Sequence, residues 1–300
     1  MGNFSSWINA ARLRTLPLSI SGIIVGTTIA VQQGHFNIVI FSLALCTTLG
    51  LQILSNLAND YGDGVKGTDN ENRVGPARAI QSGLISAKEM KQGIWITSIA
   101  TMILAVMLIY VAFGNENFLS ALVFFALGLA GIVAAIKYTV GDNAYGYRGL
   151  GDVFVFIFFG LVAVYGSYFL YTLEFNWLVV LPAFAIGFLS AGVLNLNNMR
   201  DRDSDAKSGK NTLVVKMGAG RSKNYHYFLI IGASFCLVIF SVFTADSWSD
   251  FLYLIGFIPL FLHLKRVVEN GNPMLLDPEL KILALTTFFI SILFGLGLII

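Results

Sequence analysis

The stretch 36–69, FNIVIFSLALCTTLGLQILSNLANDYGDGVKGTD, contains the two features on which the interpretation of the whole chain rests. Its first part, 36–57, is an apolar run long enough to cross a bilayer core, which takes about 20 apolar residues in a helix. Its second part, 56–69, is a cluster of asparagine and aspartate residues that begins where the apolar run ends. Carboxylates at this depth are costly to leave bare, so this end of the predicted helix is the first candidate for a functional site.

The composition shows that the rest of the chain resembles the apolar part of this stretch. Hydrophobic residues make up 56% of the 300 residues and charged residues only 12%, about half of the ~25% that is usual in a soluble domain. The formal net charge is +2. These values exclude a soluble globular protein, a disordered chain and a basic-patch nucleic-acid binder. We therefore expect a lipid bilayer as the surroundings and no nucleic-acid partner.

Apolar runs of the same length recur from the first residues to the last. They predict an all-α polytopic membrane protein with nine transmembrane helices around a central cavity. No linker interrupts the chain, so residues 1–300 are expected to form a single domain. Within it, the first four spans and the next four form a pseudo-repeat, and the ninth span stands outside it. The predicted spans are 17–33, 36–57, 93–113, 118–138, 151–172, 176–197, 224–244, 249–267 and 280–300.

The 19 Lys and Arg residues all fall on one predicted face of the membrane. Four short loops, which alternate with the long ones, contain none of them. Because cytoplasmic loops carry the excess of Lys and Arg, the N-terminus and the long loops 58–92 and 198–223 are predicted to be cytoplasmic. The loops without basic residues are 34–35, 114–117, 173–175 and 245–248.

A second acidic cluster, 195–205, ends the sixth span in the same way that the first cluster ends the second span. In both clusters an Asn precedes an Asp by four residues, as Asn59 and Asp63 do in the first. This spacing puts the two side chains on one face of a helix, about one turn apart. Asp201 and Asp205 continue the face in the second cluster.

The two clusters together predict a site for a hard divalent cation. Crowded carboxylates repel one another and require a counter-cation, and carboxylate oxygens without His or Cys neighbours suit Mg²⁺ rather than zinc. Basic residues follow both clusters, which is the arrangement that a diphosphate bridged by Mg²⁺ requires. The alternative is that these are ordinary solvated loop charges. It is less favoured, because the clusters are doubled and both begin on membrane helices.

Three segments carry a resemblance to a known family. The segment 56–69, followed by Arg73 to Arg78, closely resembles the first aspartate motif of the UbiA-type intramembrane aromatic prenyltransferases, and in particular the branch that acts on 1,4-dihydroxy-2-naphthoate. Residues 138–160 agree further, and residues 197–212 resemble the second aspartate motif. The resemblance covers almost the whole chain.

The resemblance implies a reaction, a cofactor and a location. The family transfers a polyprenyl group from a polyprenyl diphosphate to an aromatic acceptor. In the naphthoate branch the acceptor is 1,4-dihydroxy-2-naphthoate, CO₂ and diphosphate are lost, and the product is a demethylmenaquinol of menaquinone biosynthesis. The implied cofactor is Mg²⁺. The implied location is the bacterial plasma (inner) membrane, with several membrane passes and with the site loops on the cytoplasmic side.

The resemblance also implies roles for individual residues. In the wider family the first motif has a carboxylate at the position of Gly67, whereas the next carboxylate here is Asp69. Asp63 and Asp201 are expected to be catalytic. The expected Mg²⁺ ligands are Asp63, Asp69, Asp201 and Asp205; the expected diphosphate-binding residues are Asn59, Arg73, Arg78 and Lys210; and the expected acceptor-binding residues are Tyr138, Tyr145 and Arg148.

The sequence is also compatible with two other functions. The first keeps the fold and changes the acceptor to a hydroxybenzoate, a haem or a glyceryl phosphate. The second is a membrane transporter, for which intramembrane polar groups are needed. The transporter is disfavoured because the predicted helices carry almost no charge away from their cytoplasmic ends.

Overall fold

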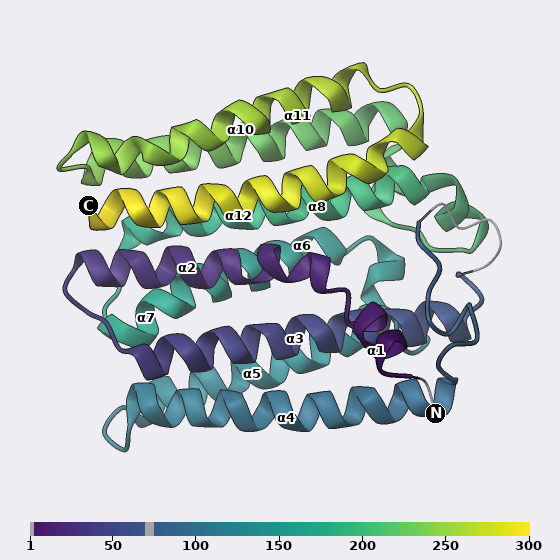
Figure 1. Ribbon diagram of the computed structural model, residues 1–300, viewed down its shortest axis with the longest axis horizontal. Coiled ribbons are helices and arrows are strands. Elements are labelled where there is room, and N and C mark those ends of the chain that lie inside the picture. The colour runs from purple at the N-terminus through teal and green to yellow at the C-terminus, as the bar shows by residue number, and fades with distance from the viewer. Residues whose placement is uncertain (1–2, 70–74) are drawn as a thin grey trace.

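The computed structural model describes residues 3–69 and 75–300, and every regular element in these ranges is a helix (Figure 1). Nine helical segments of the described chain are long and apolar enough to cross a membrane, which confirms the predicted fold class. In chain order the elements are α1 (Phe4–Ala11), η1 (Leu13–Thr15), α2 (Leu16–Gln32), α3 (Ile38–Val65), α4 (Ala87–Phe113), α5 (Phe118–Lys137), η2 (Tyr145–Arg148), α6 (Gly151–Val155), η3 (Phe156–Gly166), α7 (Ser167–Thr172), η4 (Trp177–Val179), α8 (Val180–Lys207), α9 (Leu213–Met217), α10 (Ala219–Thr244), η5 (Trp248–Gly256), α11 (Phe257–Glu269), η6 (Pro273–Leu276) and α12 (Asp277–Ile299).

The helices are longer than the apolar runs at the ends that carry the aspartate motifs. The second predicted span stops at 57, but α3 continues to Val65; the sixth stops at 197, but α8 continues to Lys207. Hydropathy marks where the polar residues begin, whereas the backbone hydrogen bonds of a helix continue through them. Asp63 and Asp201 therefore lie on the last turns of helices rather than in loops.

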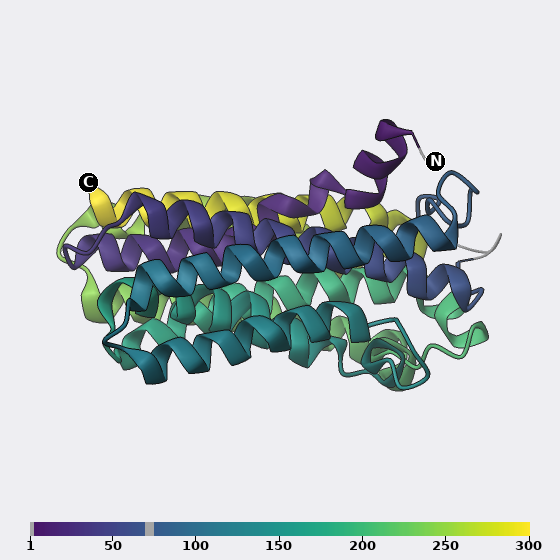
Figure 2. The same cartoon turned by 90° about the horizontal axis from the view of Figure 1, so that it is seen from below.

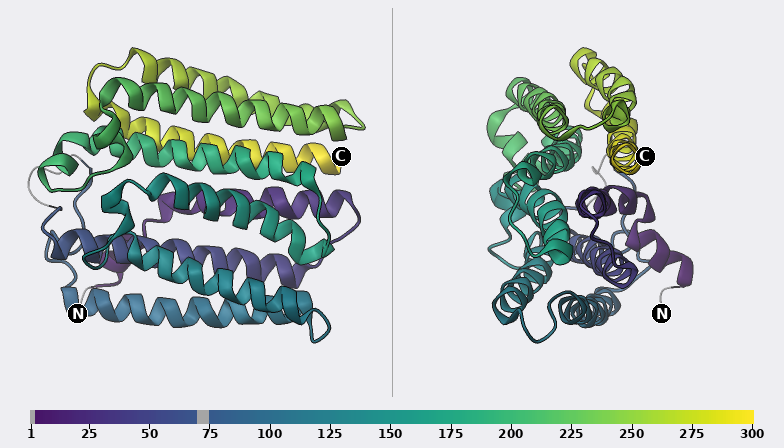
Figure 3. Two further views of the ribbon diagram at one scale, coloured as in Figure 1. Left: turned by 180° about the vertical axis from the view of Figure 1, so that it is seen from behind. Right: turned by 90° about the vertical axis from the view of Figure 1, so that its left-hand side faces the viewer.

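The long helices form two layers (Figure 2). One layer contains α12, α2, α3 and α4, and the other contains α10, α8, the α6–α7 segment and α5. Viewed along the helices, the two layers face each other across the middle of the bundle (Figure 3). Contacts of α8 with α12, of α2 with η3, and of α5 with α3 and α4 join the two layers. The equivalence of the first four and the next four spans stays a prediction.

Glycines allow α2 to pack closely against η3, which has the wide turns of a π-helix. A Cβ atom at Gly26 would lie only 2.1 Å from the carbonyl oxygen of Val164, and one at Gly22 would lie 2.6 Å from the Cβ of Ala163. The backbones therefore approach as closely as small residues permit, as is common between membrane helices.

The two ends of the bundle differ in chemistry. The N-terminus and the motif-bearing ends of α3 and α8 lie at one end, and the C-terminus lies at the other (Figure 1). The turns at the C-terminal end, 33–37, 114–117, 173–176 and 245–247, contain no Lys or Arg. All the predicted site residues that the structure describes thus gather at the basic end.

Candidate active site

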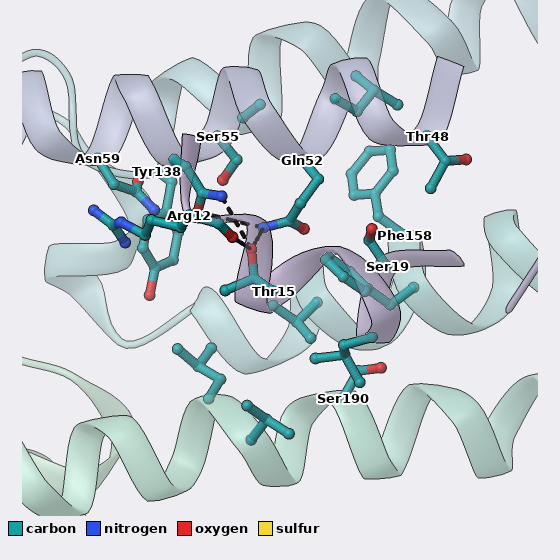
Figure 4. Close-up of a pocket in the computed structure, with 18 of the residues that line it drawn as sticks. Arg12, Thr15, Ser19, Thr48, Gln52, Ser55, Asn59, Tyr138, Phe158 and Ser190 are labelled. Carbon is teal, nitrogen blue, oxygen red and sulfur yellow. Dashed lines mark hydrogen bonds between the residues drawn. The ribbon is translucent and has the colours of Figure 1, made fainter. Parts of the chain in front are cut away.

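A large cavity lies between the layers and connects the basic end of the bundle with its apolar interior (Figure 4). Its volume is about 1020 Å³, at the upper end of the range for small-molecule sites. On α3 its lining runs from Ala44 to Asp63; at 1.5 Å per residue this corresponds to roughly 28 Å, close to the thickness of a bilayer core. Leu108, Phe124 and Leu170 line its apolar part.

The charged residues that line this cavity carry an excess of positive charge. Among the described residues, six cationic side chains and three carboxylates contribute to the lining. In a low-dielectric cavity such an excess attracts anions strongly. The cations are Arg12, Arg14, Arg78, Arg200, Lys210 and Lys281, and the carboxylates are Asp60, Asp63 and Asp277.

Asp63 is held by a tyrosine from the other layer of the bundle. The Tyr147 hydroxyl donates a hydrogen bond to Asp63 Oδ1 at 2.8 Å and lies 2.6 Å from the Thr68 hydroxyl. Burial and the negative charge of Asp63 raise the pKa of Tyr147, so this hydroxyl keeps its proton and remains a donor. This hydrogen bond therefore holds the Asp63 carboxylate in position.

A glycine of the first motif allows the 138–152 segment to reach this site. A Cβ atom at Gly62 would lie 2.5 Å from the Thr139 hydroxyl oxygen. Thr139 donates to the carbonyl oxygen of Ala58 at 2.9 Å and lies 3.3 Å from Asn59 Oδ1. Any larger residue at 62 would push the 138–152 segment, which carries Tyr147, away from the helix that carries Asp63.

Lys210 brings the two aspartate motifs together. Its ammonium lies 3.6 Å from Asp63 Oδ2 and 3.7 Å from Asp205 Oδ1. Burial opposes the charge of this side chain, but the carboxylates of Asp63 and Asp205 outweigh burial and raise the pKa of Lys210. A cation shared between carboxylates from α3 and α8 thus closes the polar end of the cavity.

Arginines neutralise the remaining predicted metal ligands. Arg78 lies 3.5 Å from Asp69 and 4.0 Å from Asp63. Arg200 grips Asp201 in a bidentate pair, with its Nε and Nη2 donating at 2.8 and 2.7 Å. A planar guanidinium matches a carboxylate in this way, and such pairs are among the stronger charge-assisted hydrogen bonds. Each of these carboxylates consequently has a positive neighbour.

The donor set fits a hard divalent cation in its chemistry. Carboxylates from both motifs converge on one positive charge, and hard oxygen donors of this kind suit Mg²⁺. In this conformation the Lys210 ammonium lies between Asp63 and Asp205, two of the carboxylates that would hold such an ion. Among the residues that the structure describes, no three His, Cys, Asp or Glu side chains already form a closed metal cluster. The carboxylates are assembled, and cationic side chains separate them.

The predicted acceptor-binding residues divide into two groups. Tyr138 and Tyr145 line the cavity, with their rings edge to face at a centroid distance of 5.4 Å, and Tyr145 stacks on Phe154 at 4.0 Å. Arg148 is exposed and donates to the side chain of Asn143, so the structure does not bring it to the cavity. The tight turn of η2 directs Tyr147 inward and Arg148 outward.

The other predicted residues are placed as follows. Asn59 lines the cavity beside Tyr138 (Figure 4). Arg78 and Lys210 also line it, whereas Asp69, Asp201 and Asp205 are not lining residues and each contacts a cationic side chain. Arg73 lies outside the described residues.

The comparisons with known proteins agree with this geometry. Residues 19–274 match the model of the UbiA prenyltransferase family. The chain belongs to this family.

Relatives and a solved structure match the UbiA chain over nearly its whole length. It is 45% identical to the 1,4-dihydroxy-2-naphthoate octaprenyltransferase of Haemophilus influenzae, over 98% of this chain and 96% of that protein. It is 41% identical to the protein of that name from Escherichia coli K12, over 98% and 94%. The solved structure of a UbiA homolog from Archaeoglobus fulgidus bound to GPP and Mg²⁺ superimposes with a TM-score of 0.66 at 15% identity, covering 96% of this chain and 99% of that one. This last likeness shows the shared fold.

Sequence reasoning missed Tyr147 and Arg200 as members of this UbiA site. Arg200 stands directly before Asp201 within the second motif, and its position there was the available signal. Tyr147 lies inside the segment that carried the family resemblance, but nothing local indicates that its hydroxyl reaches a residue 84 positions earlier. Only the packing of the 138–152 segment on α3 reveals that contact.

Asp60, the third aspartate of the first motif besides Asp63 and Asp69, binds the backbone of a neighbouring segment. Its buried carboxylate accepts the backbone N–H groups of Ala79 and Ile80, at 3.0 and 3.1 Å. It thereby anchors the chain that follows the first motif and carries Arg78 over the cavity. Asp60 and Asp63 both line the cavity, but Asp60 holds backbone N–H groups whereas Asp63 contacts the side chains of Tyr147 and Lys210.

Replacing Asp60 by Ala should lower the thermal stability of the protein. The change leaves two backbone N–H groups without their acceptor, and a buried unsatisfied donor costs about 1–3 kcal/mol. Thermal unfolding in detergent micelles measures the effect, and Asp203→Ala, at an exposed aspartate of the second motif, is the matched control. Equal unfolding temperatures for the two variants would contradict the anchoring role of Asp60.

Proposed function

We propose that this chain transfers a polyprenyl group from a polyprenyl diphosphate to 1,4-dihydroxy-2-naphthoate, with loss of CO₂ and diphosphate, giving a demethylmenaquinol. The observation that carries the proposal is the cavity: carboxylates of both aspartate motifs share a cation at its polar end, and apolar side chains line its remainder. The full-length relatives named 1,4-dihydroxy-2-naphthoate octaprenyltransferase support the choice of acceptor.

The polar end of the cavity suits the diphosphate of the donor. Arg78 and Lys210 present positive charge at the cavity wall, and Asn59 adds an amide donor. Mg²⁺ held by Asp63, Asp69, Asp201 and Asp205 would supply the further charge that stabilises the diphosphate as it leaves. Tyr147 keeps Asp63 oriented through its hydrogen bond. The prenyl tail then extends along the apolar lining, past Leu108 and Phe124.

The reaction breaks the allylic C–O bond and leaves an allylic carbocation beside the acceptor. The aromatic rings of Tyr138, Tyr145 and Phe154 line the cavity near its polar end, and ring faces stabilise cations in surroundings without water. A ring carbon of the naphthoate attacks the cation, a C–C bond forms, and the bond to the carboxylate breaks to release CO₂. The apolar walls protect the cation from capture by water.

Membranes containing this chain should convert 1,4-dihydroxy-2-naphthoate and octaprenyl diphosphate to a product with the mass of a demethylmenaquinol. Octaprenyl diphosphate is the donor of choice because the named relatives are octaprenyltransferases. EDTA should stop the reaction and added Mg²⁺ should restore it, because the carboxylates need a divalent counter-ion to hold the diphosphate. The assay also offers 4-hydroxybenzoate as acceptor, and a prenylated benzoate as the main product would overturn the naphthoate assignment.

Asp63→Asn and Asp201→Asn should each reduce turnover at least a hundredfold, the scale on which loss of one electrostatic contact to a reacting group is felt. Each substitution keeps the size of the side chain and removes its charge, so the helix ends should remain intact. Turnover of the purified variants, with Asp203→Asn as the matched control, measures the effect. Near-normal turnover in either variant would refute a diphosphate site built from both motifs.

We further propose that the chain lies in the bacterial plasma membrane, with its N-terminus and site loops in the cytoplasm. The support is the absence of Lys and Arg from the turns at the C-terminal end of the bundle. The same orientation exposes the mouth of the cavity to soluble cytoplasmic acceptors.

Single cysteines at exposed positions on the two ends should react from opposite sides of the membrane. In a Cys46→Ser, Cys236→Ala background, Asn115→Cys should react with an impermeant maleimide in intact cells, because its turn is external. Lys207→Cys should react only after permeabilisation. Reaction of Lys207→Cys in intact cells would reverse the proposed orientation.

A further inference from the structure

Two of the three histidines form a buried chain of side chains outside the cavity. His226 on α10 and His263 on α11 are both fully buried, and their Nε2 atoms lie 3.0 Å apart. His263 Nδ1 lies 2.6 Å from Oε2 of Glu279 on α12. At the other end, Asn195 Nδ2 on α8 lies 3.5 Å from His226 Nδ1. Four helices are thus joined by one line of polar groups.

If both rings are neutral, the partners assign one direction to this chain of hydrogen bonds. Glu279 also accepts from Arg266 on α11, at 3.1 Å from Nη2, so it is an ionised acceptor and His263 Nδ1 must donate to it. A neutral His263 then accepts at Nε2, and His226 must donate from its own Nε2. The remaining His226 Nδ1 accepts from the amide of Asn195. Each nitrogen of the two neutral rings then has one role, and Asn195 Nδ2 also donates to the carbonyl oxygen of Ser222 at 3.2 Å.

An ion pair also joins α8 and α12 directly. Asp277, two residues before Glu279 on α12, pairs with Arg200 Nη1 on α8. Arg200 is the residue that grips Asp201 and also holds Asn197 Oδ1 at 2.9 Å. Asp277 and Arg200 both line the cavity. The start of α12 is therefore tied to α8 twice, once through the cavity wall and once through the histidines.

We propose that the Asn195–His226–His263–Glu279 chain positions the second aspartate motif for binding of the metal and the diphosphate. The chain holds the first turn of α12 against α8, so that Asp277 meets Arg200 and Arg200 presents Asp201. Loss of a histidine link lets the α12 turn shift, and the carboxylate at the far end of the Asp277–Arg200–Asp201 series loses its set orientation. The histidines are positioning residues, and the inference rests on the proposed function of the cavity.

The test compares His226→Leu, which removes the link, with His226→Gln, whose amide can still donate to His263. The readout is the Mg²⁺ concentration that half-saturates the thermal stabilisation of the purified protein by pyrophosphate. We expect His226→Leu to raise it roughly tenfold, the scale of one lost buried hydrogen bond, and His226→Gln to raise it less than about twofold. Ser234→Ala, a buried position farther along α10 that bonds only the carbonyl oxygen of Ile230, should leave it unchanged.

A double substitution distinguishes positioning from general loosening of the bundle. If His226 acts through Asp277, then adding His226→Leu to Asp277→Asn should change the Mg²⁺ requirement far less than the product of the separate effects. In turnover assays His226→Leu should raise KM for octaprenyl diphosphate and leave KM for the naphthoate unchanged.

Multiplicative effects of the two substitutions, or a His226→Leu variant that behaves like Ser234→Ala, would overturn the inference. A wild-type protein that binds Mg²⁺ and pyrophosphate but transfers no prenyl group would contradict the proposed function instead, and the binding comparison would still test the histidine chain.

Discussion

The contact on which the site depends is the sharing of the Lys210 ammonium by Asp63 and Asp205. These carboxylates come from helices in different layers of the bundle, and both are buried. Without positive charge between them, two carboxylates in a region of low dielectric would repel one another and pull the motif ends of α3 and α8 apart. Lys210 therefore stabilises the closed bundle at the place proposed for the divalent cation and the diphosphate.

The same principle extends across the polar end of the cavity. Asp201 is neutralised by Arg200, and Asp69 by Arg78. Such ion pairs offset the free-energy cost of burying these carboxylates in the folded protein before any ligand binds. They also leave an excess of positive charge on the cavity wall. An anionic ligand would therefore meet a favourable electrostatic potential at the cavity wall. A metal ion would have to compete with Lys210 and the arginines for the carboxylates.

The apolar part of the molecule performs the complementary task. α2 and η3 approach closely through Gly22 and Gly26, whereas the cavity opens where α3 and α5 face α8. A bundle that is tight on one side of the cavity and open on the other can take up a long apolar chain without losing its shape. The charged end and the apolar lining thus give one cavity a polar part and an apolar part.

Much of this could be predicted from local features of the chain. A span of about 20 apolar residues, the spacing of Asn59 and Asp63, and the restriction of basic residues to one set of loops are each set by neighbouring residues. They sufficed for the nine helices and for the two motifs at one end of the bundle. The resemblance to a family added expected roles, because its motifs are long stretches of chain.

What only the tertiary structure decided is which distant side chains meet. Lys210 bridges the motifs, Tyr147 reaches Asp63, and Asp60 holds the backbone of the segment that carries Arg78. Arg148 turns outward although it stands next to Tyr147 in the chain, and two histidines that look isolated in the sequence lie in contact. These contacts join residues on different helices, and their existence depends on how the helices are rotated and offset against one another. No local pattern encodes that rotation, since it results from the close packing of the whole bundle.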